Sequence, residues 1–179
     1  ATEARLRKII EWLPADAVDV DLTHFSDARI TTPTQTRPNA PIRRMLDLLG
    51  DTDHARLLSH AFNEQKLRLI RDRTVDGDLT IEGVFAAEAI DAIVATADLR
   101  DLLRDIVTSE NAEIRVVEED IPVAVEVTDD RTHLLLRNDE GIVRASLDTD
   151  DGAVRAWADR LHETYWRDGR TLTPAEFDQ

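Results

Sequence analysis

The chain opens and closes with hydrophobic residues at helical spacing, and shorter apolar segments lie between these two runs. An N-terminal helix is predicted over residues 2–12, because its apolar residues share one side of a helix. These residues are Leu6, Ile9, Ile10 and Leu13. A closing helix is predicted over residues 152–167, with Val154, Trp157, Leu161, Tyr165 and Trp166 on its apolar side. Two amphipathic helices therefore flank the central part of the chain.

Residues 39–111 alternate between helical and strand-like patterns. Helices are predicted over 39–49, 63–73, 86–95 and 99–107, and strands over 56–59 and 79–85, with an earlier short strand at 27–32. Asn39 and Pro41 suit the start of the first of these helices, and Gly50 suits its end. The βαβα alternation predicts parallel strands joined by crossover helices.

From Ala112 onward, short strands follow one another without a helix between them. They are predicted over 114–117, 121–127, 133–136 and 142–147, and this spacing favours an antiparallel meander of about four strands. The expected fold class is α/β, with α+β as the alternative. We expect a linker or dimerisation helix over 1–14, one domain over 15–168 whose character changes near residue 112, and a loosely held polar tail over 169–179, in which Phe177 could dock.

Acidic residues dominate the composition. Asp and Glu number 37 against 22 Lys and Arg, which gives a net charge of −15 over 179 residues. Such a chain repels itself in dilute buffer and is best tolerated where molar salt screens the charge, so a halophile is expected, with an acidic mesophilic protein as the alternative. The absence of cysteine excludes disulfides and thiolate metal sites and fits a reducing cytoplasm. No apolar run reaches the roughly 20 residues of a membrane span, and a nucleic-acid-binding domain would be basic.

None of the common catalytic or cofactor-binding motifs occurs in the sequence. Gly-x-Ser-x-Gly elbows, Walker loops and Rossmann glycine fingerprints are absent, and so is the His-x-Lys pair of phosphodiesterases. The five histidines lack the spacing of a helical metal pair, and segment 148–152 lacks the glutamate that completes a calcium loop. We therefore expect no enzyme activity, no catalytic residue, no metal and no cofactor.

One segment is basic within this acidic chain. Arg37, Asn39, Arg43 and Arg44 lie where a polar loop enters a predicted helix, and free backbone N–H groups there would help arginines to hold a phosphate or a carboxylate. Pairing of these arginines with local carboxylates is an equal alternative. Ligands of open α/β sheets sit beyond the carboxyl ends of strands. The residues that follow the strand at 56–59 are therefore candidates for the same crevice: Ser59, His60, Asn63 and Glu64.

Segments 38–44 and 114–130 resemble a known family. The second segment contains Pro122 and paired aspartates, and a glycine-bearing hairpin and a helix with Trp157 follow it. This pattern is similar to the C-terminal effector region of haloarchaeal winged-helix transcriptional regulators, the group with the FilR1-type middle domain. The resemblance covers nearly the whole chain. It implies an effector-sensing, dimerising module that reaches DNA only through a winged helix ahead of it, which this sequence does not contain.

Taken together, the residues and the resemblance predict the sensing domain of a transcription regulator. A small anionic metabolite, phosphorylated or carboxylated, would enter between the Arg37–Arg44 loop and the Ser59–Glu64 strand end and shift a homodimer between two arrangements. The dimer contact is expected on the helices at 2–13 and 152–167. A dimerisation module without a ligand and an unrecognised enzyme are the alternatives. The chain begins at Ala1 in helical sequence, which suggests a piece of a longer protein, although removal of an initiator methionine would also explain it.

Overall fold

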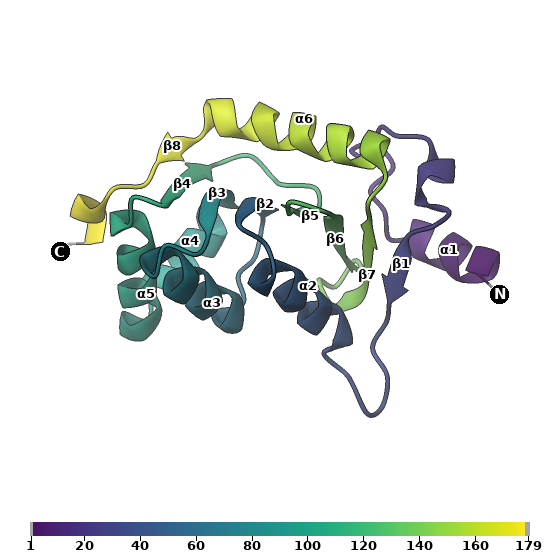
Figure 1. Ribbon diagram of the computed structural model, residues 1–179, viewed down its shortest axis with the longest axis horizontal. Helices are drawn as coiled ribbons and strands as arrows, with labels where there is room; N and C mark the ends of the chain where they lie inside the picture. Colours follow the sequence, from purple (N-terminus) through teal and green to yellow (C-terminus); the bar gives the residue numbers. More distant parts are fainter. Residues whose placement is uncertain (1, 178–179) are drawn as a thin grey trace.

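A mixed sheet forms the centre of the computed structural model, which describes residues 2–177 (Figure 1). Its eight strands in the described part of the chain run in the order β1-β7-β6-β5-β2-β3-β4-β8. The parallel strands are β2 (His54–Ser59), β3 (Thr80–Ala86) and β4 (Ala112–Val117). Antiparallel to their neighbours are β5 (Ala124–Val127), β6 (Thr132–Arg137) and β7 (Val143–Thr149), with β1 (Arg29–Thr31) and β8 (Arg170–Thr171) at the two edges. The predicted α/β class is confirmed.

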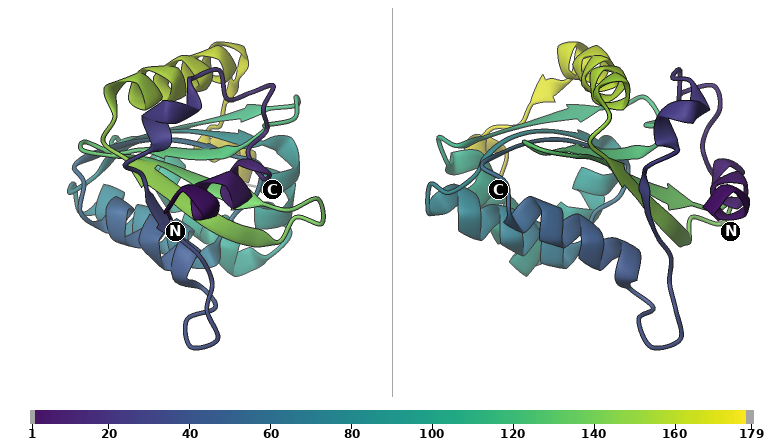
Figure 2. Two further views of the ribbon diagram at one scale, coloured as in Figure 1. Left: turned by 90° about the vertical axis from the view of Figure 1, so that its right-hand side faces the viewer. Right: turned by 45° about the vertical axis from the view of Figure 1, so that its right-hand side comes forward.

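The parallel half follows the predicted βαβα alternation. Helix α3 (Glu64–Val75) connects β2 to β3, and helices α4 (Ala87–Val94) and α5 (Ala97–Thr108) connect β3 to β4. Together with α2 (Ala40–Gly50), these helices cover one face of the sheet (Figures 1 and 2). Leu57, Ile81 and Ile114 pack there against Ile70 and Leu103, all at most 2 % exposed. Crossover helices on a continuous apolar sheet face are what parallel strands require.

The meander differs from the prediction in its first strand. Segment 114–117 belongs to β4, which is parallel to β3, so the antiparallel meander consists of β5, β6 and β7 and adjoins β2 on the other side of the parallel strands. After β4 the chain crosses the end of the sheet, and Ile121 and Val123 are buried there before the ladder begins at Ala124. Pro122 has no N–H for a ladder, which agrees with the late start of β5.

The opposite face of the sheet is covered by α6 (Gly152–Asp168), with α1 (Thr2–Ile10) and the short helix η1 (Leu22–Phe25) beside it (Figure 2). Val154 and Trp157 pack into a second core with Val84 and Leu147. The N-terminus of α6 is capped by Asp151, whose Oδ1 accepts hydrogen bonds from the backbone N of Ala153 and Val154 at 2.8 and 3.1 Å. This cap fixes where the helix begins.

In the C-terminal segment two apolar side chains are buried, one of them Phe177, whereas the other residues from 170 to 176 are exposed. Leu172 and Phe177, which lies in the short helix η2 (Pro174–Phe177), are 5 % and 4 % exposed and join the core beneath α5. The backbone N of Leu172 donates to the carbonyl of Ile114 at 2.8 Å. Within residues 2–177, no helix has the length and apolar character needed to cross a membrane.

Candidate functional site

A cavity of about 560 Å³ lies where the chain enters α2, beside the loop that hangs away from the sheet in Figure 1. We call it the arginine cavity. It is lined by Arg29, Thr31, Arg37, Pro38, Asn39, Ala40, Arg43, Arg44 and Asp47. Four arginines thus face one aspartate in a chain whose net charge is −15. The predicted basic segment does form the wall of a cavity, and Arg29 on β1 joins it from the edge of the sheet.

Local hydrogen bonds shape the loop that carries Arg37. The backbone N of Arg37 donates to Thr34 Oγ1 at 3.0 Å, and the backbone N of Thr34 donates to the carbonyl of Arg37 at 3.1 Å. Asn39 occupies the capping position of α2, and its side chain forms no capping hydrogen bond there. Its carbonyl accepts the first helical bond from the backbone N of Arg43 at 2.9 Å. The amide side chain of Asn39 is therefore not used by a local cap, whereas the backbone N of Ala40 donates to the carbonyl of Arg37 at 3.3 Å and Pro41 has no N–H.

Arg44 connects the arginine cavity to the interior. Its Nε and Nη2 donate to Oδ2 and Oδ1 of Asp148 on β7, both at 2.9 Å. Arg131 forms an ion pair with Oδ1 of the same carboxylate, which is fully buried, and donates to its backbone carbonyl at 3.0 Å. Burial would raise the pKa of Asp148, but the hydrogen bonds and charges of Arg44 and Arg131 outweigh it and hold the pKa below its ordinary value. Asp148 is thus the internal counter-ion of two arginines.

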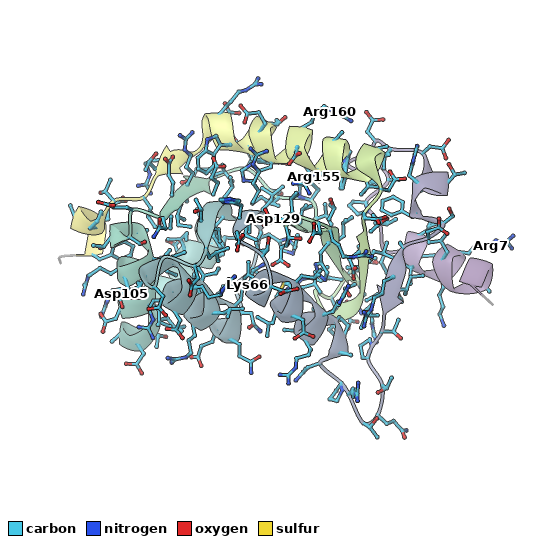
Figure 3. All side chains as sticks on the ribbon, viewed as in Figure 1. Arg7, Lys66, Asp105, Asp129, Arg155 and Arg160 are labelled. Atoms are coloured by element: carbon cyan, nitrogen blue, oxygen red, sulfur yellow. The ribbon has the colours of Figure 1, made fainter. Side chains whose placement is uncertain are left out.

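Next to Asp148, three strands place polar side chains on the face that α2 and α3 cover. Glu126 on β5 pairs with His133 on β6, which in turn pairs with Asp148 on β7, and Ser146 lies two residues before Asp148. Within the described chain, neither carboxylate oxygen of Glu126 has a hydrogen-bond partner, nor do His133 Nε2 and Ser146 Oγ. Lys66 on α3, which is labelled in Figure 3, faces this cluster. Its Nζ lies 3.6 Å from Oε1 of Glu126. These residues form a buried polar cluster between helices and sheet.

Burial governs the protonation of this cluster. It raises the pKa of Glu126 to about 7, against the opposing charge of Lys66. It also lowers the pKa of His133 to about 3, although Asp148 acts in the other direction, so His133 is neutral at pH 7. None of these residues was predicted as part of a site. The sequence does contain a pattern that could have indicated the cluster. Each of three successive predicted strands has a charged or polar residue beside an apolar one, namely Glu126, His133 and Ser146.

The second group of predicted site residues lies elsewhere. Ser59 ends β2, and its Oγ donates to the carbonyl of Ala61 at 2.5 Å. Asn63 caps α3, because its Oδ1 accepts from the backbone N of Lys66 at 3.0 Å. Glu64 is exposed and pairs with Arg68 at 3.7 Å. Three of the four residues thus have local structural contacts.

His60 lines a second cavity, of about 460 Å³, together with residues from the segment that follows α1. None of Ser59, His60, Asn63 and Glu64 is part of the wall of the arginine cavity. The structure therefore brings Arg37, Asn39, Arg43 and Arg44 together and separates them from the end of β2. The expected single crevice corresponds to two cavities.

Comparisons with known proteins agree with this architecture. The chain matches TrmBL2, described as an archaeal chromatin protein with a novel mode of DNA binding, with a TM-score of 0.61 and 11 % sequence identity, over 95 % of this chain. It spans only 62 % of TrmBL2. A phospholipase D family member, Nuc from Salmonella typhimurium, matches with a TM-score of 0.58 and 9 % identity over 82 % of this chain and 99 % of its own. NucT from Helicobacter pylori matches with a TM-score of 0.61 and 9 % identity, over 81 % of this chain and 98 % of its own. At such identities the likeness concerns the fold.

The family is identified by sequence. No curated protein matches the chain significantly. Residues 38–168 match the family model of the middle domain of the methanogenesis regulatory protein FilR1. The match begins at the loop that forms the arginine cavity and ends with α6, and it confirms the resemblance predicted from the sequence. The chain therefore belongs to the FilR1 middle-domain family, a family of regulatory domains.

Proposed function

We propose that this chain is the effector-binding domain of a transcription regulator and that it binds a small polyanionic metabolite in the arginine cavity. The observation that carries the proposal is the concentration of four arginines around one cavity of a strongly acidic chain. Among the described residues, Arg29, Arg37 and Arg43 form no ion pair with a carboxylate, whereas Arg44 pairs with Asp148. Planar guanidinium groups bind phosphate and carboxylate groups in a bidentate manner. The cavity therefore offers three unpaired cations to a ligand.

Arg44 provides a route from the ligand to the interior. An anion in the cavity would compete with Asp148 for Arg44. Arg131 would then be the remaining cation that pairs with the buried carboxylate of Asp148. Arg131 lies in the turn between β5 and β6, where Nη1 of Arg155 on α6 also donates to the carbonyl of Thr128 at 2.7 Å. A ligand can shift such an arrangement only if it binds one state more tightly than the other. Competition for Arg44 supplies that difference in affinity.

Thermal unfolding with pyrophosphate and with citrate, at constant ionic strength in molar KCl, tests the proposal. A ligand at 100 times its Kd adds about 2.7 kcal/mol to the free energy of unfolding, which corresponds to roughly 5–11 °C in Tm for a chain of this size. Arg43→Ala should abolish the shift. The matched control is Arg160→Ala, because Arg160 is exposed on α6, on the other face of the sheet (Figure 3). The absence of a shift, or an equal shift in both variants, would contradict a ligand site at the arginine cavity.

In this proposal another domain of the regulator binds DNA. The regulator as a whole acts in the cytoplasm. A homodimer remains a prediction. The apolar side of α6, on which the dimer contact was expected, packs on the sheet through Val154, Trp157 and Ala158. Sedimentation velocity with and without pyrophosphate would measure the oligomeric state directly.

A nuclease of the phospholipase D type is the second candidate function, because Nuc, a phospholipase D family member, shares the fold. The sequence has no His-x-Lys pair, and its lysines are Lys8 and Lys66. His133 is 1 % exposed and so cannot reach a polymeric substrate without rearrangement. We therefore propose a domain without enzyme activity. Hydrolysis of bis(p-nitrophenyl) phosphate that disappears in His133→Ala would favour the nuclease instead.

A further inference from the structure

The second cavity, which His60 lines, lies at one end of the central strands. We call it the β2-end cavity. Its wall comes from the residue after β2, the residues before β5, the end of β6 with the following turn, and the segment after α1. The polar and aromatic residues of this wall include Glu11, Trp12, His60, Arg137 and Asp139. Segments from four distant parts of the sequence therefore meet at this cavity.

The position of the β2-end cavity follows from the topology of the sheet. The chain passes from β2 to β3 and β4 on one side and then returns to the other side of β2 as β5, so the strand order reverses beside β2. In open α/β sheets, ligands bind beyond the carboxyl ends of strands at such a point. The volume of about 460 Å³ is in the range of small-molecule sites.

Arg137 supplies the positive charge on the wall of the β2-end cavity. In the described chain its guanidinium forms no ion pair, its Nε is buried without a hydrogen-bond partner, and its Nη1 donates to the carbonyl of Gly141 at 3.1 Å. Burial lowers the pKa of Arg137, as expected for a cation without a counter-ion. An anion that pairs with such a half-buried cation would offset the cost of its partial desolvation. A ligand carboxylate would supply that anion.

The other groups on the wall select against a highly charged ligand. Burial, followed by the charge of Arg137, lowers the pKa of His60, whose Nδ1 is buried without a partner among the described residues. A neutral imidazole donates one hydrogen bond and accepts another, as a hydroxyl group requires. Glu11 and Asp139 would repel additional negative charge but accept hydrogen bonds from hydroxyls. Half-buried Trp12 offers an aromatic surface to the apolar face of a ring.

We propose that the β2-end cavity binds a hydroxylated monocarboxylate, such as a sugar acid, as a second ligand site independent of the arginine cavity. The carboxylate pairs with Arg137, the hydroxyls bond to His60, Glu11 and Asp139, and the ring lies against Trp12. Because the segment of residues 11–14 directly follows α1, an occupant also ties α1 to the ends of the central strands. Occupancy of this site would thus fix the position of α1.

Isothermal titration calorimetry at constant ionic strength with D-glucuronate, D-glucose and acetate tests the site. We expect saturable binding of D-glucuronate and at least tenfold weaker binding of glucose, which lacks the carboxylate, and of acetate, which lacks the ring. Arg137→Gln should weaken D-glucuronate at least tenfold, and Trp12→Leu, which removes the aromatic surface under the ring, should weaken it severalfold. Trp12 is only half-buried, so Trp12→Leu gives a second test if Arg137→Gln does not fold. Arg43→Ala should leave this binding unchanged, which separates the two cavities.

Three results would overturn the proposal. They are the absence of saturable D-glucuronate binding, acetate binding as tight as that of D-glucuronate, and unchanged affinity in a folded Arg137→Gln or in Trp12→Leu. A loss of D-glucuronate binding in Arg43→Ala would also count against it, because the ligand would then occupy the arginine cavity.

Discussion

The buried pair of Lys66 and Glu126 predicts a large, pH-dependent loss of stability when Lys66 is replaced by Met. The two residues are 9 % and 1 % exposed, and Nζ lies 3.6 Å from Oε1. At an effective dielectric constant of about 20, two unit charges at this separation attract each other by roughly 5 kcal/mol. Methionine keeps the apolar stem and leaves the carboxylate of Glu126 without its cation. We therefore expect Lys66→Met to lower the free energy of unfolding by about 3–5 kcal/mol at pH 8.

The effect of pH follows from the raised pKa of Glu126. Because the folded value is about 7 and the ordinary value is 4.5, the folded state holds this proton more tightly than the unfolded state does. The resulting stabilisation is fully present below about pH 4.5 and is lost as the pH rises through about 7. In Lys66→Met, Glu126 binds its proton at still higher pH. The loss in the free energy of unfolding caused by Lys66→Met should therefore become smaller as the pH is lowered toward about 7, by up to roughly 1.4 kcal/mol per pH unit.

Urea unfolding at pH 8 and pH 6, in the same concentration of KCl, measures both effects. The slope with denaturant should stay constant, so that the change in midpoint reports stability. The double variant Lys66→Met with Glu126→Leu serves as the control, because an apolar pair of similar volume should restore most of the loss. A loss below about 1 kcal/mol at pH 8, or one that is equal at the two pH values, would refute a charged, buried pair.

Three further predictions concern stability. Asp148→Asn should cost about 3–5 kcal/mol in urea unfolding, because Arg44 and Arg131 lose their shared counter-ion, and a loss under about 1 kcal/mol would mean that solvent reaches these arginines. Gly169→Ala should lower the calorimetric Tm, at a cost of about 1–3 kcal/mol, because the new Cβ would lie 2.8 Å from the Cβ of Arg115; Gly152→Ala, where nothing lies within 4 Å, should not lower it. Raising KCl from dilute to molar concentration should raise Tm, because salt screens the net charge of −15, and a flat salt dependence would argue against adaptation to high salt.

The positions of most helices and strands could be predicted because apolar spacing reflects which side of an element is buried. The closing helix, predicted over 152–167, is observed over 152–168. Strand order could not be predicted in the same way. Whether the strand after residue 120 adjoins β4 or β2 depends on the path of residues 118–123 across the end of the sheet, and local spacing does not encode that path. The two-residue strand β8 is too short to show any alternation.

The arginine cavity was partly visible in the sequence because basic residues stand out in an acidic chain. Arg29 was missed, because β1 reaches the cavity only through its pairing with β7. The separation of His60 from the arginines also depends on packing. Helix α2 lies over β6 and β7, whereas His60 follows β2, so the two groups occupy different parts of the sheet.

Both margins of the sheet are closed by very short strands, the three residues of β1 beside β7 and the two residues of β8 beside β4. Unpaired strand margins are templates on which other chains can add and aggregate. If β8 detached, β4 would offer its free N–H and C=O groups, and detachment of β1 would do the same for β7. These few residues therefore protect a much larger sheet from growing by self-association, and they are the places where aggregation of this protein would begin.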